Sequence, residues 1–250
     1  MKTQQISNIW VTCPNPNPKA RIRLFCLPYA GRGASSFRTW SNDLPPEFEV
    51  CPIQLPGREN RLKEPPLTQI SQIVKALAPL LDPYLDLPFA FFGHSMGALI
   101  CFELSREIRR VGNPSPIHLF ISGCPAPQKL DLSPPIHELP ASEFVEELCR
   151  RYNCIIPESV QQNADLMQLF LPALRADLAT GETYIYTPEA PLNCPISLFG
   201  GLQDGVVSQE ALEAWREQTH NSVTVSMFPG NHFFINSVRS NVLTCIAKLY

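Results

Sequence analysis

The 250-residue sequence has little charge, no run of basic residues and no long apolar stretch. Charged residues make up 17% of it, and the formal net charge is −3. Nucleic-acid binding needs clustered lysine and arginine, so no nucleic-acid partner is expected. The apolar runs are far shorter than the roughly 20 residues that cross a bilayer, so no membrane partner is expected. The N-terminal stretch MKTQQISNIWVTC lacks the apolar centre of a signal peptide, which favours a cytoplasmic protein.

The sequence also lacks paired cysteines. Its nine cysteines show no C-x-x-C spacing, and four of them lie inside apolar runs: Cys26, Cys51, Cys101 and Cys124. Cysteines in such runs are typically small buried side chains. We therefore expect no disulfide framework, no metal site and no organic cofactor, in keeping with a reducing compartment.

Hydrophobic residues make up 44% of the sequence, which is enough for a sizeable core. Short apolar runs flanked by Gly or Pro predict strands at Arg21–Leu27, Phe48–Leu55, Pro88–Phe92, His118–Ser122, Ile196–Phe199 and Val223–Phe228. One predicted helix has an apolar face formed by Leu67, Ile70, Val74, Leu77 and Leu81. Three more are predicted at Met96–Val111, Gln209–Gln218 and Asn236–Tyr250. This alternation predicts an α/β fold, with a mostly parallel central sheet and helices on both faces.

Residues 125 to 191 depart from the alternation. They contain no convincing strand pattern, and the clearest helical patterns are Glu138–Tyr152 and Asn163–Leu178. An insertion of this length at the rim of a sheet is most simply a helical lid. We therefore expect a core formed by residues 1–125 and 191–250, with residues 126–190 as the lid.

The sequence Gly93-His94-Ser95-Met96-Gly97 lies between a predicted strand and a predicted helix. A serine at such a sharp turn has a strained backbone, so the residues two positions away must be small. The turn lifts the hydroxyl to the carboxyl edge of the sheet, next to a helix N-terminus. An ordinary glycine-rich turn is the alternative, but the coincidence of strand, motif and helix favours Ser95 as a nucleophile.

Four histidines follow Ser95, and a catalytic base should come after the acid in the chain. His118 begins a strand and His137 lies in the predicted lid, both before the plausible acid. His220 lies in a polar turn, which is typical of a surface histidine. His232 follows the last predicted strand, in a loop that can reach over the nucleophile, so it is the predicted base.

The acid should follow an earlier strand. Asp204 lies in the loop after the Ile196–Phe199 strand, which is the expected place. A turn-forming or helix-capping aspartate is the alternative there. Asp177 is a rival, but it belongs to a predicted lid helix. In the predicted arrangement Asp204 orients His232, which takes the proton of Ser95 and later passes it to the leaving group.

An oxyanion formed during acyl transfer needs two backbone donors. The amide of Met96 follows the nucleophile directly, and the loop after the first strand supplies the second, for which we predict Ala30. Gly31 and Gly33 would allow this loop to bend toward the substrate. A phosphate-binding loop is the alternative, but the segment lacks the terminal Gly-Lys-Ser/Thr of such loops.

Six stretches resemble a known family: LPYAGRGASSF, QLPGRENRLKEPP, FFGHSMGALICFEL, LFLPALRADLATGETYIY, GGLQDGVVSQEALEAW and FPGNHFF. Together they span most of residues 24–235. The chain resembles the type II thioesterases, α/β-hydrolases that edit nonribosomal peptide and polyketide synthases. The resemblance implies the triad Ser95, Asp204 and His232, with Ala30 and Met96 as amide donors. It also implies a partner, an acyl or peptidyl carrier protein with a phosphopantetheine arm, and we expect a monomer.

One arginine departs from this family pattern, and two others, inside a matching stretch, are harder to explain physically. The family usually has glycine where this chain has Arg32, so this side chain could narrow the entrance or contact the carrier. Arg58 and Arg61 could bind an acidic carrier or the pantetheine phosphate. They could equally bridge their loop to carboxylates of the body, which we favour slightly.

The predicted function is therefore hydrolysis of acyl or aminoacyl thioesters on carrier proteins, to remove aberrant groups from a synthase. A medium-chain acyl-carrier-protein thioesterase that releases a product, or an acyltransferase, could use the same triad. A non-catalytic carrier-docking module is an alternative of another class, although it would need no catalytic Ser, Asp and His. Hydrolysis of small esters is a weaker alternative.

Overall fold

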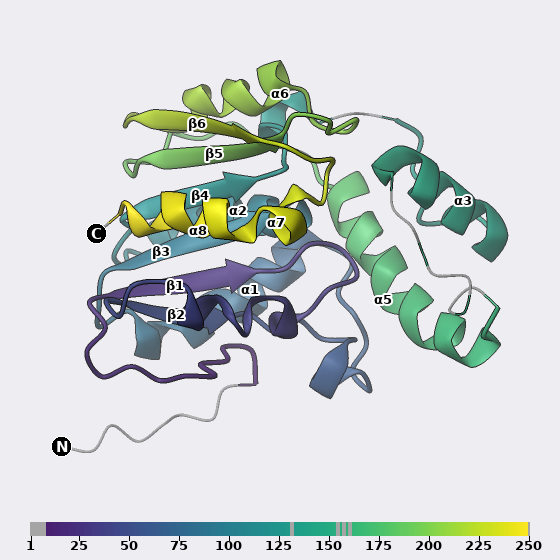
Figure 1. The fold of residues 1–250 in the computed structure, drawn as a ribbon, viewed down its shortest axis with the longest axis horizontal. Helices are drawn as coiled ribbons and strands as arrows, with labels where there is room; N and C mark the ends of the chain where they lie inside the picture. The colour runs from purple at the N-terminus through teal and green to yellow at the C-terminus, as the bar shows by residue number, and fades with distance from the viewer. Residues whose placement is uncertain (1–8, 131–132, 154–155, 157–158, 160–161, 250) are drawn as a thin grey trace.

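The central element is a six-stranded sheet with the strand order β2-β1-β3-β4-β5-β6. The computed structural model describes residues 9–130, 133–153, 156, 159 and 162–249. Every neighbouring pair of strands is parallel, as predicted. The strands are β1 (Ile22–Leu27), β2 (Phe48–Pro52), β3 (Phe89–His94), β4 (His118–Ser122), β5 (Ile196–Gly201) and β6 (Val223–Phe228). Their arrowheads point to one edge in Figure 1, where the helices of the predicted lid lie.

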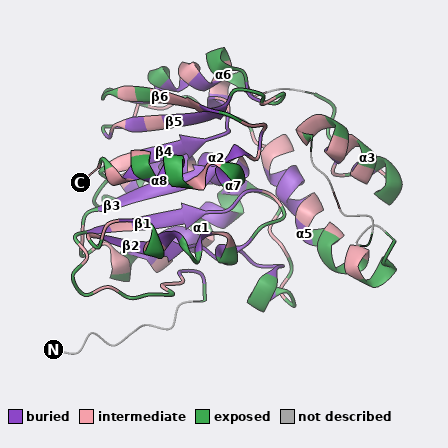
Figure 2. Cartoon of the chain, viewed as in Figure 1, coloured by how far each residue is buried: buried purple, intermediate pink, exposed green. Residues whose placement is uncertain are grey.

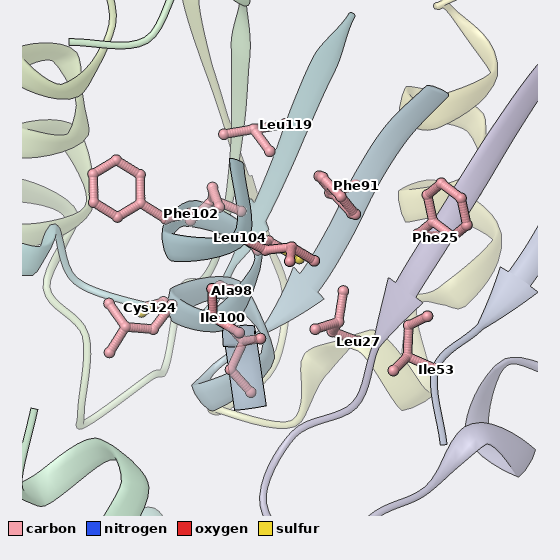
Figure 3. Packing of buried hydrophobic residues seen from close by; sticks show 14 of the residues in the cluster. Phe25, Leu27, Ile53, Phe91, Ala98, Ile100, Phe102, Leu104, Leu119 and Cys124 are labelled. Atoms are coloured by element: carbon pink, nitrogen blue, oxygen red, sulfur yellow. The ribbon is translucent and has the colours of Figure 1, made fainter. Parts of the chain in front are cut away.

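Helices cover both faces of the sheet. The long helices on one face are α1 (Ile70–Leu81) and α2 (Met96–Arg110), and α6 (Gln209–Glu213) packs on the same side. The other face carries α7 (Phe234–Ser237) and α8 (Arg239–Ala247). Alternate residues of one strand enter different cores, since Phe25 and Leu27 pack with α1 and α2 while Leu24 and Cys26 pack with α8. Figure 3 shows the first of these cores, and Figure 2 shows that the strands other than β6 are largely buried. The chain therefore has the α/β-hydrolase fold.

Several helix predictions need correction. The first helix begins at Ile70 rather than Leu67, because the prolines just before Leu67 disfavour helical backbone and Gln69 is still extended. The predicted helix Gln209–Gln218 is α6 followed by a 3-10 turn, Ala214–Gln218. In this turn Trp215 is fully buried and its indole N–H donates to the Cys124 carbonyl at 2.9 Å.

The C-terminal helix also differs from the prediction. It starts at Phe234, earlier than expected, and is divided into α7 and α8 at Val238, whose backbone is not helical (φ −115°, ψ 30°). Phe234 is fully buried. This start places the helix directly after the loop that carries His232.

The segment predicted to be a lid contains the helices α3 (Ala141–Tyr152) and α5 (Ala164–Glu182). Each begins a little later than predicted, α3 because Pro140 takes the N-cap position. A small apolar cluster holds them together, with four buried members: Ile136, Phe144, Leu148 and Leu178. The exact division at residues 125/126 and 190/191 stays a prediction.

Among the described residues, no helix is both long and apolar enough to cross a membrane. This agrees with the short apolar runs of the sequence.

Candidate active site

Ser95 occupies a sharp turn between β3 and α2. Its backbone has φ 52° and ψ −121°, a conformation that residues with a side chain rarely adopt. Its N–H donates to the Ser122 carbonyl at 2.8 Å, which extends the pairing of β3 with β4 by one residue. The strained turn is thus fixed by the sheet, and Ser95 is presented at the carboxyl edge.

The turn requires glycine at positions 93 and 97, because neighbouring backbone atoms occupy the space that a side chain would need at Gly93 and Gly97. A Cβ on Gly93 would lie 2.3 Å from the Gly97 carbonyl oxygen, and a Cβ on Gly97 would lie 2.3 Å from that of Leu27. Both distances are far below van der Waals contact. The start of α2 therefore packs directly on the backbone of β3 and β1, as the sequence motif predicted.

The structure brings the three predicted catalytic side chains together. The His232 Nε2 lies 3.1 Å from Ser95 Oγ, and its Nδ1 lies 2.9 Å from Asp204 Oδ2. The side chains of His232 and Asp204 are 3% and 0% exposed. Because an ionised carboxylate can only accept, Nδ1 donates to Asp204 and Nε2 is left to accept the serine proton.

The Asp204 carboxylate is itself held by its own loop. Its Oδ1 accepts the N–H groups of Val206 and Val207 at 2.8 and 3.2 Å. These two bonds leave Oδ2 facing the imidazole. Asp204 therefore also makes the turn contacts of the alternative interpretation, and the two roles are compatible.

His94 is a buried neighbour of this arrangement that sequence reasoning passed over, although it belongs to the serine motif. Its Nδ1 lies 2.8 Å from Ser122 Oγ, and its ring centroid lies 5.2 Å from that of His232. Its Nε2 has no hydrogen-bond partner among the described residues. Burial, with a smaller contribution from His232, holds the pKa of His94 well below its ordinary value. His94 is therefore a neutral ring that packs against His232.

The two predicted oxyanion donors lie in segments that meet at this edge. Among the described residues, neither the Ala30 nor the Met96 amide donates a hydrogen bond. The next amide in the loop is engaged, since the Gly31 N–H donates to Asp177 Oδ2 at 2.8 Å. Of these two loop amides, only that of Ala30 is available to a substrate.

Arg58 and Arg61 are buried and engaged in the structure. Arg58 Nη1 and Nη2 donate to Asp177 Oδ2 and Oδ1 at 2.5 and 2.8 Å. Arg61 donates to the Gln54 carbonyl and to Glu64, and it stacks over the Trp10 ring at 4.3 Å. Both arginines are therefore engaged within the protein, but the carboxylate that Arg61 contacts, Glu64, lies in its own loop and not in the body. For Arg58, the carboxylate belongs to the lid helix α5 and not to the body.

Three other residues singled out in the sequence, Arg32, His220 and His137, lie apart from the hydrogen-bond chain. Arg32 is exposed on the loop after β1, with its guanidinium 6.0 Å from the centre of the Tyr29 ring. His220 is exposed, as expected of a surface histidine. His137 is engaged within the lid, where its Nδ1 lies 2.6 Å from Glu182.

The lid also contacts the catalytic edge through the end of α3, which sequence reasoning missed. The Tyr152 ring lies 5.5 Å from that of His232, between centroids. The Asn231 side chain donates to the Asn153 carbonyl at 3.4 Å. No local motif marks Tyr152, because its position depends on how α3 packs against the core.

Two other features could suggest a ligand. Cys13, Glu49 and Cys51 lie close enough to share a metal ion, but Glu49 already pairs with Arg23 at 2.6 Å and accepts the Asn17 N–H. We assign no metal to them. A cavity of about 390 Å³ lies between α1, α2 and residues 183–187, and none of the predicted catalytic residues is among those that line it.

Known proteins are similar to this chain in sequence and in fold. The thioesterase domain family model matches residues 22–250. The chain is 48% identical over 241 residues to the gramicidin S biosynthesis protein GrsT of Aneurinibacillus migulanus, covering 96% of this chain and 93% of GrsT. The solved structure of the type II thioesterase BorB, from the borrelidin biosynthetic cluster, matches with a TM-score of 0.86 and 34% identity, over 97% of this chain and 96% of BorB. The RedJ thioesterase of Streptomyces coelicolor, from the prodiginine pathway, matches with a TM-score of 0.85 and 37% identity, over 93% and 92%. The chain therefore belongs to the thioesterase family, as a type II thioesterase that hydrolyses thioesters.

Proposed function

We propose that this protein removes acyl or aminoacyl groups from the phosphopantetheine arm of carrier proteins, with Ser95 as the nucleophile. Type II thioesterases of nonribosomal peptide and polyketide systems act on carrier proteins, and the similar proteins named above come from such pathways. We further propose that the carrier belongs to such a synthase and that the groups removed are aberrant ones. The observation that carries the proposal is the hydrogen-bonded chain from Ser95 through His232 to Asp204.

In the proposed mechanism, Ser95 Oγ attacks the thioester carbonyl while His232 Nε2 takes its proton. The oxyanion accepts hydrogen bonds from the Ala30 and Met96 amides, and one such donor is worth about 10²–10³ in rate. The C–S bond breaks, and the pantetheine thiol leaves with the proton from His232. Water, deprotonated by His232, then attacks the acyl-serine and releases the free acid.

The residues around the triad support this mechanism. Asp204 stabilises the imidazolium that forms when His232 takes the proton, because its carboxylate is shielded from water and directed at Nδ1. His94 stays neutral beside His232, so it does not add a second positive charge at the moment of proton transfer. No other charged group is needed for the steps above.

The test loads a phosphopantetheinyl carrier protein with a panel of acyl and aminoacyl groups and follows their release by mass spectrometry. Broad, modest release of short groups is the expected result. Ser95→Ala should lower the rate by about 10⁶, as removal of a triad serine does. Ser240→Ala, at an exposed serine of α8, is the matched control and should leave the rate unchanged.

Other outcomes of the panel would change the proposal. A single strongly preferred long chain would indicate release of a product in place of editing. Equal rates for wild type and Ser95→Ala would contradict Ser95 as the nucleophile. Turnover of no thioester, with binding of the carrier, would support the docking alternative.

A further inference from the structure

The pair formed by Asp177 and Arg58 links the lid to the loop that carries Ala30. Asp177 lies on α5 and Arg58 on the loop after β2, and their side chains are 1% and 8% exposed. The two contacts between them form a bidentate ion pair. The triad does not use these residues, although the pair lies beside the predicted oxyanion donor.

Both members of the pair also hold the backbone of this loop. Asp177 Oδ2 accepts the Gly31 N–H at 2.8 Å, and Arg58 Nη1 donates to the Arg32 carbonyl at 3.2 Å. Gly31 has a φ of 76°, in the left-handed region that glycine enters easily but need not keep. An outside partner is therefore needed to fix the peptide that follows Ala30, and through it the direction of the Ala30 amide.

Stability alone does not account for the pair. Desolvation of two buried charges offsets much of their attraction, so a well-packed apolar pair can be as stable. Burial accordingly raises the pKa of Asp177, while Arg58 and the Gly31 N–H counteract this effect. An apolar pair could not accept a hydrogen bond from the Gly31 N–H. The ion pair therefore differs from an apolar pair in that it can hold this backbone amide.

We propose that Asp177 and Arg58 are positioning residues for the oxyanion hole, so that the lid helix α5 completes the catalytic machinery of the core. This inference rests on the proposed role of the Ala30 amide. The half of α5 that carries Asp177 then stays docked during turnover. Entry of the substrate involves the other half of α5 and α3.

The burial of α5 agrees with this division. All of its buried residues lie at or after Ala173, whereas Leu169 and Phe170 are 43% and 52% exposed. Pro172 separates the two halves and removes one helical hydrogen bond. On the docked side, Thr180 Oγ1 contacts the Leu67 carbonyl at 3.4 Å.

The test replaces Arg58 and Asp177 together, because replacing only one would leave the other charge buried without its partner. In the double variant Arg58→Met with Asp177→Leu, the buried pair becomes apolar and the acceptor for Gly31 is lost. In Arg58→Met with Asp177→Asn, a neutral acceptor is kept. We expect both to melt near the wild-type temperature, since apolar replacement of a buried pair is often tolerated.

The expected difference lies in turnover of acetyl-pantetheine. The Leu variant should show a kcat about 10–100-fold lower with little change in KM, because one oxyanion donor is misplaced. The Asn variant should recover part of the rate, because it keeps an acceptor for the Gly31 N–H but loses the Arg58 contact with the Arg32 carbonyl. A folded Leu variant with wild-type kcat would overturn the proposal. If the Leu variant does not fold, Arg58→Lys, which keeps the charge but loses the bidentate contact, must still lower kcat.

A second readout separates this proposal from the proposed function. An alkyl fluorophosphonate reacts with a triad serine and places its phosphonyl oxygen in the oxyanion hole, so its rate of labelling Ser95 should fall in the Leu variant. Wild type that is labelled but hydrolyses no thioester would contradict the proposed function only. Equal labelling rates in wild type and variant would contradict the positioning role. Arg106→Lys is the matched control, since Arg106 is a buried, ion-paired arginine about three turns along α2 from Ser95.

Discussion

The carboxyl edge of the sheet and the lid that faces it are held in place by different means. At the sheet edge, Ser95 is fixed by backbone pairing with β4 and by glycines on which neighbouring backbones pack. In the predicted lid, α3 and α5 meet through a small apolar cluster, and α5 contacts the loop after β1 through Asp177, which accepts the Gly31 N–H. The comparison teaches that the proposed reacting groups lie where the sheet fixes the backbone, while the predicted lid combines a docked half with an exposed one.

After the loss of Ser95 itself, the largest effect should come from breaking the sheet edge at the acid. Asp204→Asn should lower kcat by about 10⁴, because the amide favours the wrong tautomer of His232. The melting temperature should change little. Steady-state hydrolysis of an acyl-pantetheine measures the effect, with Asp43→Asn, at a surface ion pair, as the control. A loss below tenfold would mean that another group orients His232.

The next comparison truncates one buried phenylalanine in each region. Phe91 and Phe144 are both fully buried, the first in the sheet and the second in the lid cluster. Phe91→Ala should lower the free energy of unfolding by about 3–5 kcal/mol. Phe144→Ala should mainly free the lid, with faster proteolysis between α3 and α5 and a smaller change in global unfolding. Equal effects in denaturant titrations would show that the lid and sheet unfold as one unit.

Lowering the pH should have a smaller effect on the stability of the folded chain, and this effect comes from two histidines of the sheet. Burial holds the pKa of His94 well below 6.5 and lowers that of His118 to about 4. Both rings stay neutral in the folded chain but take up protons in the unfolded chain. Their contribution to stability is therefore complete above pH 6.5 and declines as the pH falls below it.

The corresponding measurement is the melting temperature between pH 8 and pH 4. It should fall below pH 6.5, and His118→Gln should make the fall shallower. The same substitution at the exposed His220 is the control. An unchanged slope in His118→Gln would show that the acid sensitivity has another source.

The smallest effect should come from the exposed half of α5. Phe170 is 52% exposed, so Phe170→Ser should leave the melting temperature and the hydrolysis of acetyl groups unchanged. If long acyl chains contact this side chain, their KM should rise by about tenfold or less, as for a partial loss of apolar contact. Equal KM values for acetyl and decanoyl carriers in wild type and variant would exclude Phe170 from the acyl site.

The sheet and its catalytic edge were predictable because their signals are local. The apolar runs of β1, β3 and β4 are buried, as their sequences predict. The glycines on either side of Ser95 indicate the tight turn in the sequence itself. Asp204 and His232 each follow a strand, so parallel strand order was enough to bring them toward Ser95.

The contacts of the lid were not predictable in the same way. Arg58 and Asp177 are 119 residues apart in the chain, and no local sequence pattern around either residue predicts that they pair. The packing of Tyr152 against His232 depends on the orientation of α3, which an amphipathic pattern does not specify. Helix boundaries shifted where Pro140 or a buried residue such as Trp215 changed the local backbone.

The central claim, that thioesters are hydrolysed through an acyl-Ser95 intermediate, is tested most directly by partition between water and methanol. The same acyl group is supplied on a carrier protein and on a small thiol, and the ratio of free acid to methyl ester is measured. A shared acyl-enzyme predicts one ratio for both substrates and loss of both products in Ser95→Ala. A ratio that changes with the leaving thiol, or products that persist in Ser95→Ala, would contradict the account.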